Sequence, residues 1–287
     1  MNIIDKTTRW DRKDFKLSRG RLLYLAPMAL VLVILFAIPV GRIFAQAFQY
    51  NGAFGMDHFQ HILSSSGYRS VITRTLRISA ATTLITAVLG YALAYYIVFK
   101  SEHKQLLLLL VFVTMTVDLV VRIFGLIITF SRDGLAESLL TIIFDDVSLL
   151  FTEGAIVIGL VQFVLPFMIF VMVGVLSNID TDLLEAARDL GASRVQIFFR
   201  LTVPLSAEGI IVGTSLVFAL SMSSFVSPQL LGGGQNRMVA NTIYSIVFQT
   251  GDWGTASALG VILLLITMSI IVVISRSINA LVGVINR

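Results

Sequence analysis

Cysteine is absent from the 287 residues of the chain. Its absence excludes disulfide bonds, thiolate metal sites and cysteine nucleophiles, and it leaves the redox compartment undecided. Charge is also scarce: Asp, Glu, Lys and Arg make up 13% of the residues, whereas an average soluble domain has about 25%. So few charges would not cover a water-facing surface of this size, which argues against an ordinary soluble domain.

The chain is instead rich in apolar residues. Hydrophobic residues make up 56% of the sequence, and the mean hydropathy is +0.90. We therefore expect lipid to cover the outer surface. The net charge of +4 is small, and no basic face with interleaved aromatic residues occurs outside one short tail, so nucleic acid is not an expected partner.

Six apolar runs are long enough to cross a hydrocarbon core of about 30 Å, which takes about 20 helical residues. Each run must be helical, because lipid offers no partners for backbone N–H and C=O groups. The sequence predicts an all-α integral membrane protein: a basic tail (1–21), then one transmembrane domain (22–287) without visible internal repeats. The six expected transmembrane helices are 22–48, 71–99, 106–130, 149–176, 205–227 and 256–281.

Positive charge gathers on one side of these expected spans. Fourteen of the 21 basic residues precede span one, follow span two or span four, or follow or end span six, whereas the loop between spans three and four is acidic. The positive-inside rule then places both termini in the cytoplasm. The basic residues that carry this bias are Lys6, Arg9, Arg12, Lys13, Lys16, Arg19, Arg21, Lys100, Lys104, Arg188, Arg194, Arg200, Arg276 and Arg287, and the acidic residues of the loop are Asp133, Glu137, Asp145, Asp146 and Glu153.

The first span has an alternative interpretation as a cleaved signal peptide. A basic tail precedes an apolar run, and Ala45-Gln46-Ala47 fits a cleavage site. The run from 22 to 40 is longer than the usual 7–15 residues, however, and Arg42 intervenes before the alanines. A retained first span is favoured.

One charged segment, "LLEAARDLGASRVQIFFRLTVP" at 183–204, lies between the apolar spans. Asp182 can cap a helix there, with Glu185 at capping-box spacing. Gly191 can end that helix, and Ser193 can cap a second helix that must stop before Pro204. The segment predicts a helix–Gly–helix outside the membrane on the cytoplasmic side.

The first of these helices carries an apolar stripe, formed by Leu183, Ala187 and Leu190. Its polar face holds Glu185 and Asp189 four residues apart, a like-charge pair that weakens an isolated helix. A protein partner and the lipid surface would both suit such an amphipathic helix.

Glu185-Ala186-Ala187, Gly191 and Pro204 resemble the EAA signature of binding-protein-dependent ABC importer permeases: Glu-Ala-Ala, three residues, Gly, nine residues, then Ile-x-Leu-Pro. The chain departs from it at two apolar positions, Leu201 for isoleucine and Val203 for leucine. The signature lies where the family has it.

The resemblance implies a type I importer permease in the bacterial inner membrane. Two homologous permeases, here expected as a heterodimer, would form one translocation path, each bound by an ABC ATPase subunit and served by an extracytoplasmic solute-binding protein. The coupling helix would seat on the ATPase through Leu183, Glu185, Ala186, Ala187, Leu190, Gly191 and Pro204.

Two further stretches, 225–260 and "VRIFGL" at 121–126, resemble the polyamine (spermidine/putrescine) branch of that family. They imply a polyamine or a related small amine as the solute. The chain has no Walker A motif, so ATP and Mg²⁺ would be held by the partner ATPase. We therefore expect a non-catalytic subunit with no cofactor of its own.

Asp118 and Arg122 lie one helical turn apart in the third span. An ion at the bilayer centre costs roughly 2.5–3.5 kcal/mol on insertion scales, and this spacing lets the two neutralise each other. They would either pair to stabilise helix packing or line the path, where Asp118 would meet a cationic solute.

Three polar side chains are further candidates for the path: Gln162 in span four, and Ser221 and Ser224 at the end of span five. Serines three residues apart share a helix face, but small residues also serve close helix packing. After span five, 232–234 is a run of three glycines that predicts a flexible turn.

Asp57, His58 and His61 form the only histidine cluster. A zinc site needs at least three well-placed ligands, so we predict no metal site. Two other classes remain as alternatives to the importer subunit. A self-sufficient secondary transporter or channel predicts inverted repeats and coupling-ion sites. A non-transporting scaffold would leave the intramembrane charges to packing alone.

Overall fold

The computed structural model describes residues 27, 30–50, 53–131, 134 and 150–285. The basic tail, and Asp133, Glu137, Asp145 and Asp146 of the acidic loop, lie outside the described residues. Nearly all described elements are helices; the one sheet is a hairpin of β1 (Gln49–Tyr50) and β2 (Ala53–Phe54). The all-α prediction is confirmed.

Four helices among the described residues are long and apolar enough to cross a membrane, or up to six if two bent helix pairs each count as one span. The four are Leu30–Ala47, which includes η2 (Val33–Ala37) and α2 (Ile38–Ala47), then α4 (Ser66–Phe99), α8 (Glu153–Leu176) and α15 (Trp253–Ile285). They match expected spans one, two, four and six.

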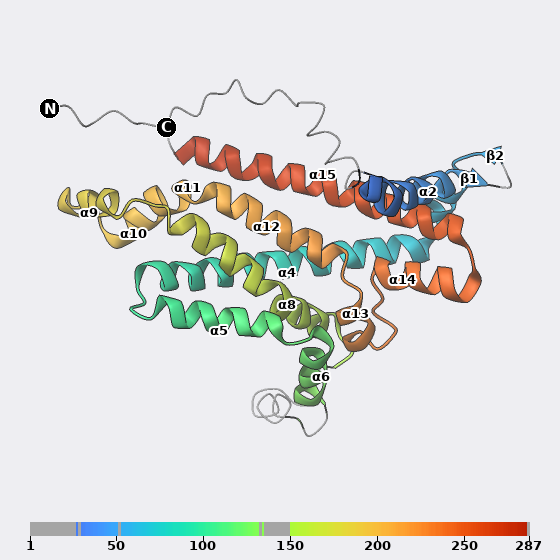
Figure 1. Ribbon diagram of the computed structural model, residues 1–287, viewed down its shortest axis with the longest axis horizontal. Helices are drawn as coiled ribbons and strands as arrows, with labels where there is room; N and C mark the ends of the chain where they lie inside the picture. The colour runs from blue at the N-terminus through green and yellow to red at the C-terminus, as the bar shows by residue number, and fades with distance from the viewer. Residues whose placement is uncertain (1–26, 28–29, 51–52, 132–133, 135–149, 286–287) are drawn as a thin grey trace.

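The long helices run side by side along the long axis of the molecule (Figure 1). Helices α4, α8 and α12 (Ala207–Met222) surround a core that contains Met168 and Met172 of α8, Ala94 of α4 and Val217 of α12. A second core joins α2 to α15 through Ala47 and Leu259. The remaining helices are α3 (Asp57–Ser64), α5 (Lys104–Thr116), α6 (Leu119–Phe130), α9 (Thr181–Asp189), α10 (Arg194–Ile197), η3 (Phe198–Thr202), α11 (Val203–Leu205), α13 (Val226–Leu231), α14 (Val239–Ser245) and η4 (Ile246–Thr250).

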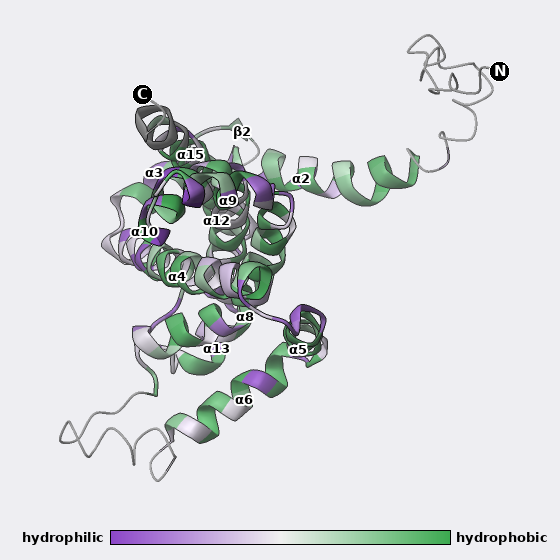
Figure 2. Cartoon of the chain, turned by 90° about the vertical axis from the view of Figure 1, so that its left-hand side faces the viewer, coloured by the Kyte–Doolittle hydropathy of each residue, from purple (hydrophilic) through white to green (hydrophobic). Residues whose placement is uncertain are grey.

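The third expected span, 106–130, is not one helix. It divides into α5 and α6, which meet at 93°, and α6 extends away from the α4–α8–α12 bundle (Figures 1 and 2). The break falls at Val117, whose backbone is extended (φ −73°, ψ 128°), and Asp118 then caps the new helix. The apolar composition continues across the break, so the sequence pattern did not reveal it.

The sequence predicted that the helix after Ser193 stops before Pro204, and this prediction is wrong. The helix continues through η3, a π-helix, into α11, and then bends by 67° into α12. Proline lacks an N–H and its ring collides with the carbonyl four residues earlier in an α-helix. The wider π turn just before Pro204 changes the spacing between the proline and the preceding carbonyls. The helix accommodates the proline in this way.

Candidate functional site

Helix α9 lies beyond the ends of α4, α8 and α12, at one end of the bundle (Figure 1). We call this the α9 end. Asp180 caps the helix, because its side chain accepts a 3.0 Å hydrogen bond from the N–H of Asp182. The predicted cap at Asp182 is therefore wrong by two residues. Asp182 instead lies in the first turn, where a carboxylate stabilises the positive end of the helix dipole.

Gly191 ends α9, as the sequence predicted. Its φ of +86° is the left-handed conformation that glycine adopts without strain. The N–H of Gly191 donates to the carbonyl of Arg188 at 2.8 Å, and the N–H of Ala192 donates to that of Ala187 at 3.0 Å. These two bonds form a Schellman motif, which satisfies carbonyls at the end of the helix.

Helix α10 begins where the sequence predicted. The Ser193 side chain accepts from the N–H of Gln196 at 3.3 Å, and the Gln196 side chain accepts from the N–H of Ser193 at 2.8 Å. This reciprocal capping box places the N-cap of α10 only two residues after Gly191. The turn between the two helices is thus set by local hydrogen bonds.

The two faces of α9 differ in burial. Leu184 is only 7% exposed and holds the helix against the rest of the chain; the predicted stripe did not include it. Leu183, Glu185 and Ala186 are exposed, and Leu190 is 89% exposed. The face that carries the EAA residues therefore points away from the described part of the chain, where a partner could reach it.

Asp118 and Arg122 do not form the ion pair that their spacing allows. Asp118 accepts a 2.8 Å hydrogen bond from the N–H of Val120 and is exposed. The Arg122 guanidinium lies 6.0 Å from the ring centroid of Phe163, and its Nε is buried with no hydrogen-bond partner among the described residues. The helix break explains the difference, because a carboxylate in front of a helix satisfies the unpaired N–H groups there.

The other predicted path residues divide into exposed and buried. Gln162 of α8 is exposed, whereas Ser221 and Ser224 are buried within the chain. The Ser221 hydroxyl donates to the carbonyl of Val217 at 2.8 Å. In this chain alone, Gln162 and Asp118 can reach a space outside the bundle and the two serines cannot; the lining of the path stays a prediction.

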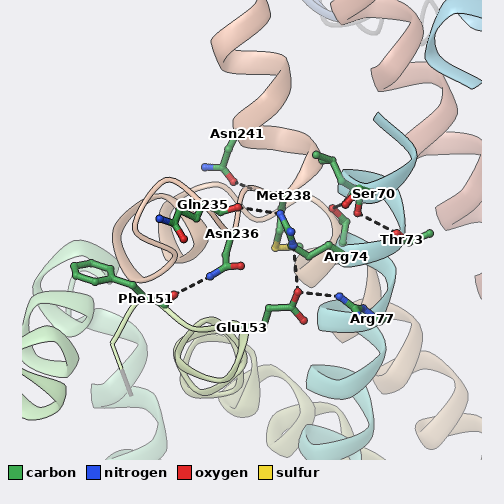
Figure 3. Close-up of polar contacts among 12 residues, drawn as sticks. Ser70, Thr73, Arg74, Arg77, Phe151, Glu153, Gln235, Asn236, Met238 and Asn241 are labelled. Atoms are coloured by element: carbon green, nitrogen blue, oxygen red, sulfur yellow. Dashed lines mark hydrogen bonds and ion pairs between the residues drawn. The ribbon is translucent and has the colours of Figure 1, made fainter. Parts of the chain in front are cut away.

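The sequence did not reveal a polar cluster near the N-terminal ends of α4 and α8, at the other end of the bundle from α9 (Figure 1). Figure 3 shows this cluster in close-up. Glu153, the first residue of α8, accepts from Nε of Arg74 at 3.2 Å and from Nη2 of Arg77 at 2.9 Å. Arg74 also donates from Nη1 to the carbonyl of Gln235 at 3.0 Å. We call these four residues the Glu153 cluster. Its signal in the sequence is a pair of arginines three residues apart inside expected span two.

The glycine turn is held beside the Glu153 cluster. Gly233 and Gly234 have φ of +61° and +76°, and a side chain at Gly233 would collide with the ring of Phe151. Asn236 then donates from Nδ2 to the Phe151 carbonyl at 2.7 Å. The turn predicted as flexible is thus tied to the residues that precede α8.

His58 links the hairpin and α3 to α15. Its Nδ1 lies 3.1 Å from the Thr255 hydroxyl and its Nε2 lies 3.3 Å from the Gln49 carbonyl. Asp252 caps α15 by accepting from the N–H of Thr255 at 2.9 Å. Burial acts to raise the pKa of Asp252, but the hydrogen bonds from Thr255 and the nearby His58 outweigh it, so the pKa lies below its usual value.

No group of three or more His, Cys, Asp or Glu side chains in the described residues could hold a metal ion. Both ring nitrogens of His58 instead make contacts within the chain.

Residues 86–283 match the family described as "Binding-protein-dependent transport system inner membrane component". The spermidine/putrescine transport system permease protein PotB of Escherichia coli strain K12 is 35% identical over 218 residues, which cover 74% of this chain and 78% of that protein. PotB of Haemophilus influenzae is 34% identical over 214 residues, covering 73% and 75%.

Two solved structures share the fold. A chain of a bacterial ABC transporter involved in the import of the acidic polysaccharide alginate superposes with a TM-score of 0.77 at 20% identity, covering 91% of this chain and 96% of that one. A chain of the methionine ABC transporter MetNI, in inward-facing conformations, gives a TM-score of 0.52 at 15% identity, covering 78% and 100%.

Proposed function

We propose, because the chain belongs to the family of binding-protein-dependent transport system inner membrane components, that α9 is the coupling helix through which this ABC importer permease receives work from a separate ATPase. The proposal rests foremost on the exposed EAA face of α9. Leu183, Ala186 and Leu190 present apolar surface outside the bundle, with Glu185 beside them. A face of this kind suits a cleft on another protein.

The turn after α9 supports the same role. The Schellman motif at Gly191 and the capping box at Ser193 fix the angle between α9 and α10. Helix α10 continues through η3 and α11 to the bend before α12. A push on α9 would therefore pass along a hydrogen-bonded helix to α12, which packs against α4 and α8.

The proposed solute is a polyamine or a related small amine. The relatives that match over three quarters of their length are named for spermidine and putrescine transport. The fold alone does not select the solute, since a similar fold serves an acidic polysaccharide. Asp118 supports a cationic solute, because its carboxylate is exposed and an ion in a membrane segment is costly unless it faces water, a counter-ion or a solute.

The proposed assembly contains partners that this chain does not supply. A second, different permease would complete the path, with Arg122, Gln162, Ser221 and Ser224 beside Asp118 as the predicted contributions of this chain. An ATPase would bind ATP and Mg²⁺ and seat α9, and a solute-binding protein would deliver the amine. The α9 end and both termini would face the cytoplasm of a bacterium, following the positive charge of the loops.

The test is ATP hydrolysis by the purified permease–ATPase complex in lipid nanodiscs with loaded binding protein. Amines, sugars and amino acids are supplied in turn, and wild type is compared with Glu185→Ala. The matched control is Glu102→Ala, because Glu102 is also an exposed carboxylate, in the turn after α4. We expect amines to stimulate hydrolysis, and stimulation to collapse in Glu185→Ala but not in Glu102→Ala, with the subunits still associated.

Two outcomes would contradict the proposal. Stimulation by sugars or amino acids alone would overturn the solute and leave the coupling role. Equal stimulation in wild type and Glu185→Ala would overturn the role of Glu185 in coupling.

A further inference from the structure

An apolar hollow of about 650 Å³ opens on the side of the bundle near the α9 end. Its floor is Met168 of α8 and Ile210 of α12, and its walls come from α4 and from the helix that precedes α12. Tyr91 forms part of one wall, with its hydroxyl turned to the Ser206 hydroxyl at 3.0 Å. The remaining lining residues are alanine, valine and aromatic side chains, so the hollow suits an apolar occupant.

A smaller, basic pocket of about 290 Å³ adjoins this hollow. The two share Tyr95, Phe198 and Phe199. The ring of Phe198 stands edge-on to the ring of Tyr95, with centroids 5.3 Å apart, and makes a similar contact with Phe199 at 4.9 Å. These aromatic rings form the boundary between the apolar and basic parts. We call the two parts together the α4–η3 groove.

The basic pocket is lined by three cations from three segments: Lys100 after α4, Arg188 of α9 and Arg194 of α10. All three are exposed, and none makes an ion pair or side-chain hydrogen bond within the described part of the chain. No carboxylate lines the pocket. Figure 2 looks at this end of the bundle and shows hydrophilic segments of α9 and α10 around the apolar helices. The pocket therefore holds three positive charges without a counter-ion from the described residues.

The length of the groove matches one leaflet of a bilayer. From Val88, in the apolar hollow, to Lys100, in the basic pocket, α4 rises about 18 Å at about 1.5 Å per residue. Half of a hydrocarbon core is about 15 Å. With Lys100 at the membrane surface, a groove of this length would reach about the middle of the bilayer, apolar in its deep part and cationic at the surface.

We propose that the α4–η3 groove binds an anionic phospholipid, with its phosphate on Lys100, Arg188 and Arg194 and an acyl chain beside Val88, Tyr91 and Phe199. Basic side chains at a membrane surface attract anionic headgroups, and the adjoining hollow gives the acyl chain a place that a soluble phosphate would not use. A cationic solute is repelled by the same three charges. The proposal does not need α9 to be a coupling helix.

The lipid would connect the turn after α4 to the α9–α10 pair. Lys100 belongs to the turn after α4, whereas Arg188 and Arg194 flank the Gly191 turn. A phosphate between them would hold the α9–α10 pair against the membrane surface.

The first test identifies the occupant by photo-crosslinking. Phe199 is replaced by p-benzoylphenylalanine, an aromatic side chain at an exposed aromatic position shared by both parts of the groove. The full permease–ATPase complex is irradiated in nanodiscs that contain phosphatidylglycerol and phosphatidylcholine, and the adduct is identified by mass. We expect a phosphatidylglycerol adduct. An adduct only to a neighbouring subunit would mean that protein covers the groove, and would overturn the proposal.

The second test measures affinity. Native mass spectrometry of the full chain follows the binding of phosphatidylglycerol and of phosphatidylcholine with identical acyl chains. We expect Lys100→Gln and Arg194→Gln each to weaken phosphatidylglycerol binding about fivefold and to leave phosphatidylcholine unchanged, since one cation near an anionic surface contributes about that factor.

Two controls complete the affinity test. Arg200→Gln removes an exposed charge six residues after Arg194 that lines neither part of the groove, so it should not change the affinity. Ala92→Phe fills the apolar hollow and should weaken the binding of both lipids. Soluble glycerol phosphate, which has no acyl chain, should compete only weakly with phosphatidylglycerol for the groove. Equal binding of the two lipids, an equal loss in Arg200→Gln, or full competition by glycerol phosphate would overturn the proposal.

Discussion

The two ends of the bundle differ in whether their polar side chains bind partners within the chain. At the α9 end, Glu185 and Arg194 are exposed, form no ion pair within the described residues, and lie near an almost fully exposed Leu190. At the opposite end, Glu153 binds two arginines at once, Asn236 ties the glycine turn to Phe151, and His58 joins α3 to α15. At the α9 end, exposed polar and apolar side chains can bind other molecules. At the opposite end, the polar groups named here bind one another and stabilise the chain.

This contrast suggests where each kind of substitution will act. Changes at the α9 end should alter assembly and coupling while the chain itself keeps its stability. Changes at the opposite end should reduce the stability of the chain whether or not partners are present. Four sets of substitutions should separate the two ends, from the largest expected effect to the smallest.

Leu190→Asp should give the largest effect. A central apolar contact in an interface contributes about 2 kcal/mol or more, so we expect the affinity for the ATPase to fall by at least about thirtyfold. Thermal unfolding of the isolated permease should stay within about 0.5 kcal/mol of wild type, because Leu190 is 89% exposed. Leu190→Met keeps the side chain apolar and should retain binding, as measured by co-purification. Equal losses in both variants would contradict an apolar contact.

Glu153→Gln should destabilise the chain itself. It leaves Arg74 and Arg77 without their shared carboxylate, and charged hydrogen bonds contribute about 1.5–3 kcal/mol when well buried. Because Glu153 is 37% exposed, we expect the lower part of that range.

The two arginines provide the matched comparison for Glu153→Gln. Arg74→Gln should cost more than Arg77→Gln in thermal unfolding, because their side chains are 22% and 69% exposed and exposed ion pairs contribute about 0–1 kcal/mol. Identical losses would show that burial does not govern the cluster.

Gly191→Ala separates backbone conformation from contact. A side chain at Gly191 or at Gly174 would meet nothing within 4 Å, but only Gly191 has a positive φ. We expect Gly191→Ala to cost about 1–2 kcal/mol locally and to lower solute-stimulated ATP hydrolysis, while Gly174→Ala in α8 has little effect. Equal behaviour of the two variants would mean that the left-handed turn is not required.

Asp252 should give the smallest effect, seen only in acid. The folded state lowers the pKa of this carboxyl, so it contributes stability above its unfolded pKa, near 3.8, and loses that contribution as the pH falls through the lower folded value. Thermal unfolding from pH 7 to pH 3 should therefore show a smaller loss of stability in Asp252→Asn than in wild type. Parallel pH curves would refute the assignment.

The sequence predicted the local features of this structure better than the distant ones. Gly191 and Ser193 were placed correctly because a left-handed C-terminus and a capping box depend on neighbouring residues only. The cap of α9 was misplaced because Asp180 and Asp182 are both good caps, and the choice between them depends on where α8 ends.

The features that were missed all depend on the rest of the fold. Glu153 and Arg74 lie 79 positions apart, so their contact has no local pattern. The break at Asp118 looked like a charged pair within one helix, and the π turn before Pro204 looked like a helix end. In each case a polar or conformationally restricted residue marked the right place, but its neighbours in sequence did not reveal what it does there.

The right-angled junction of α5 and α6 also bears on the thickness of the surrounding bilayer. Helix α5 has 13 residues and is about 20 Å long, roughly 10 Å shorter than the hydrocarbon core, and α6, at 93° to it, adds little length in the same direction. A helix that is too short must thin the bilayer or oligomerise, at a cost of fractions of a kcal/mol per Å. The isolated chain should therefore be more stable in thin membranes than in thick ones. A thicker membrane should shift the equilibrium from the solitary subunit toward the assembled transporter.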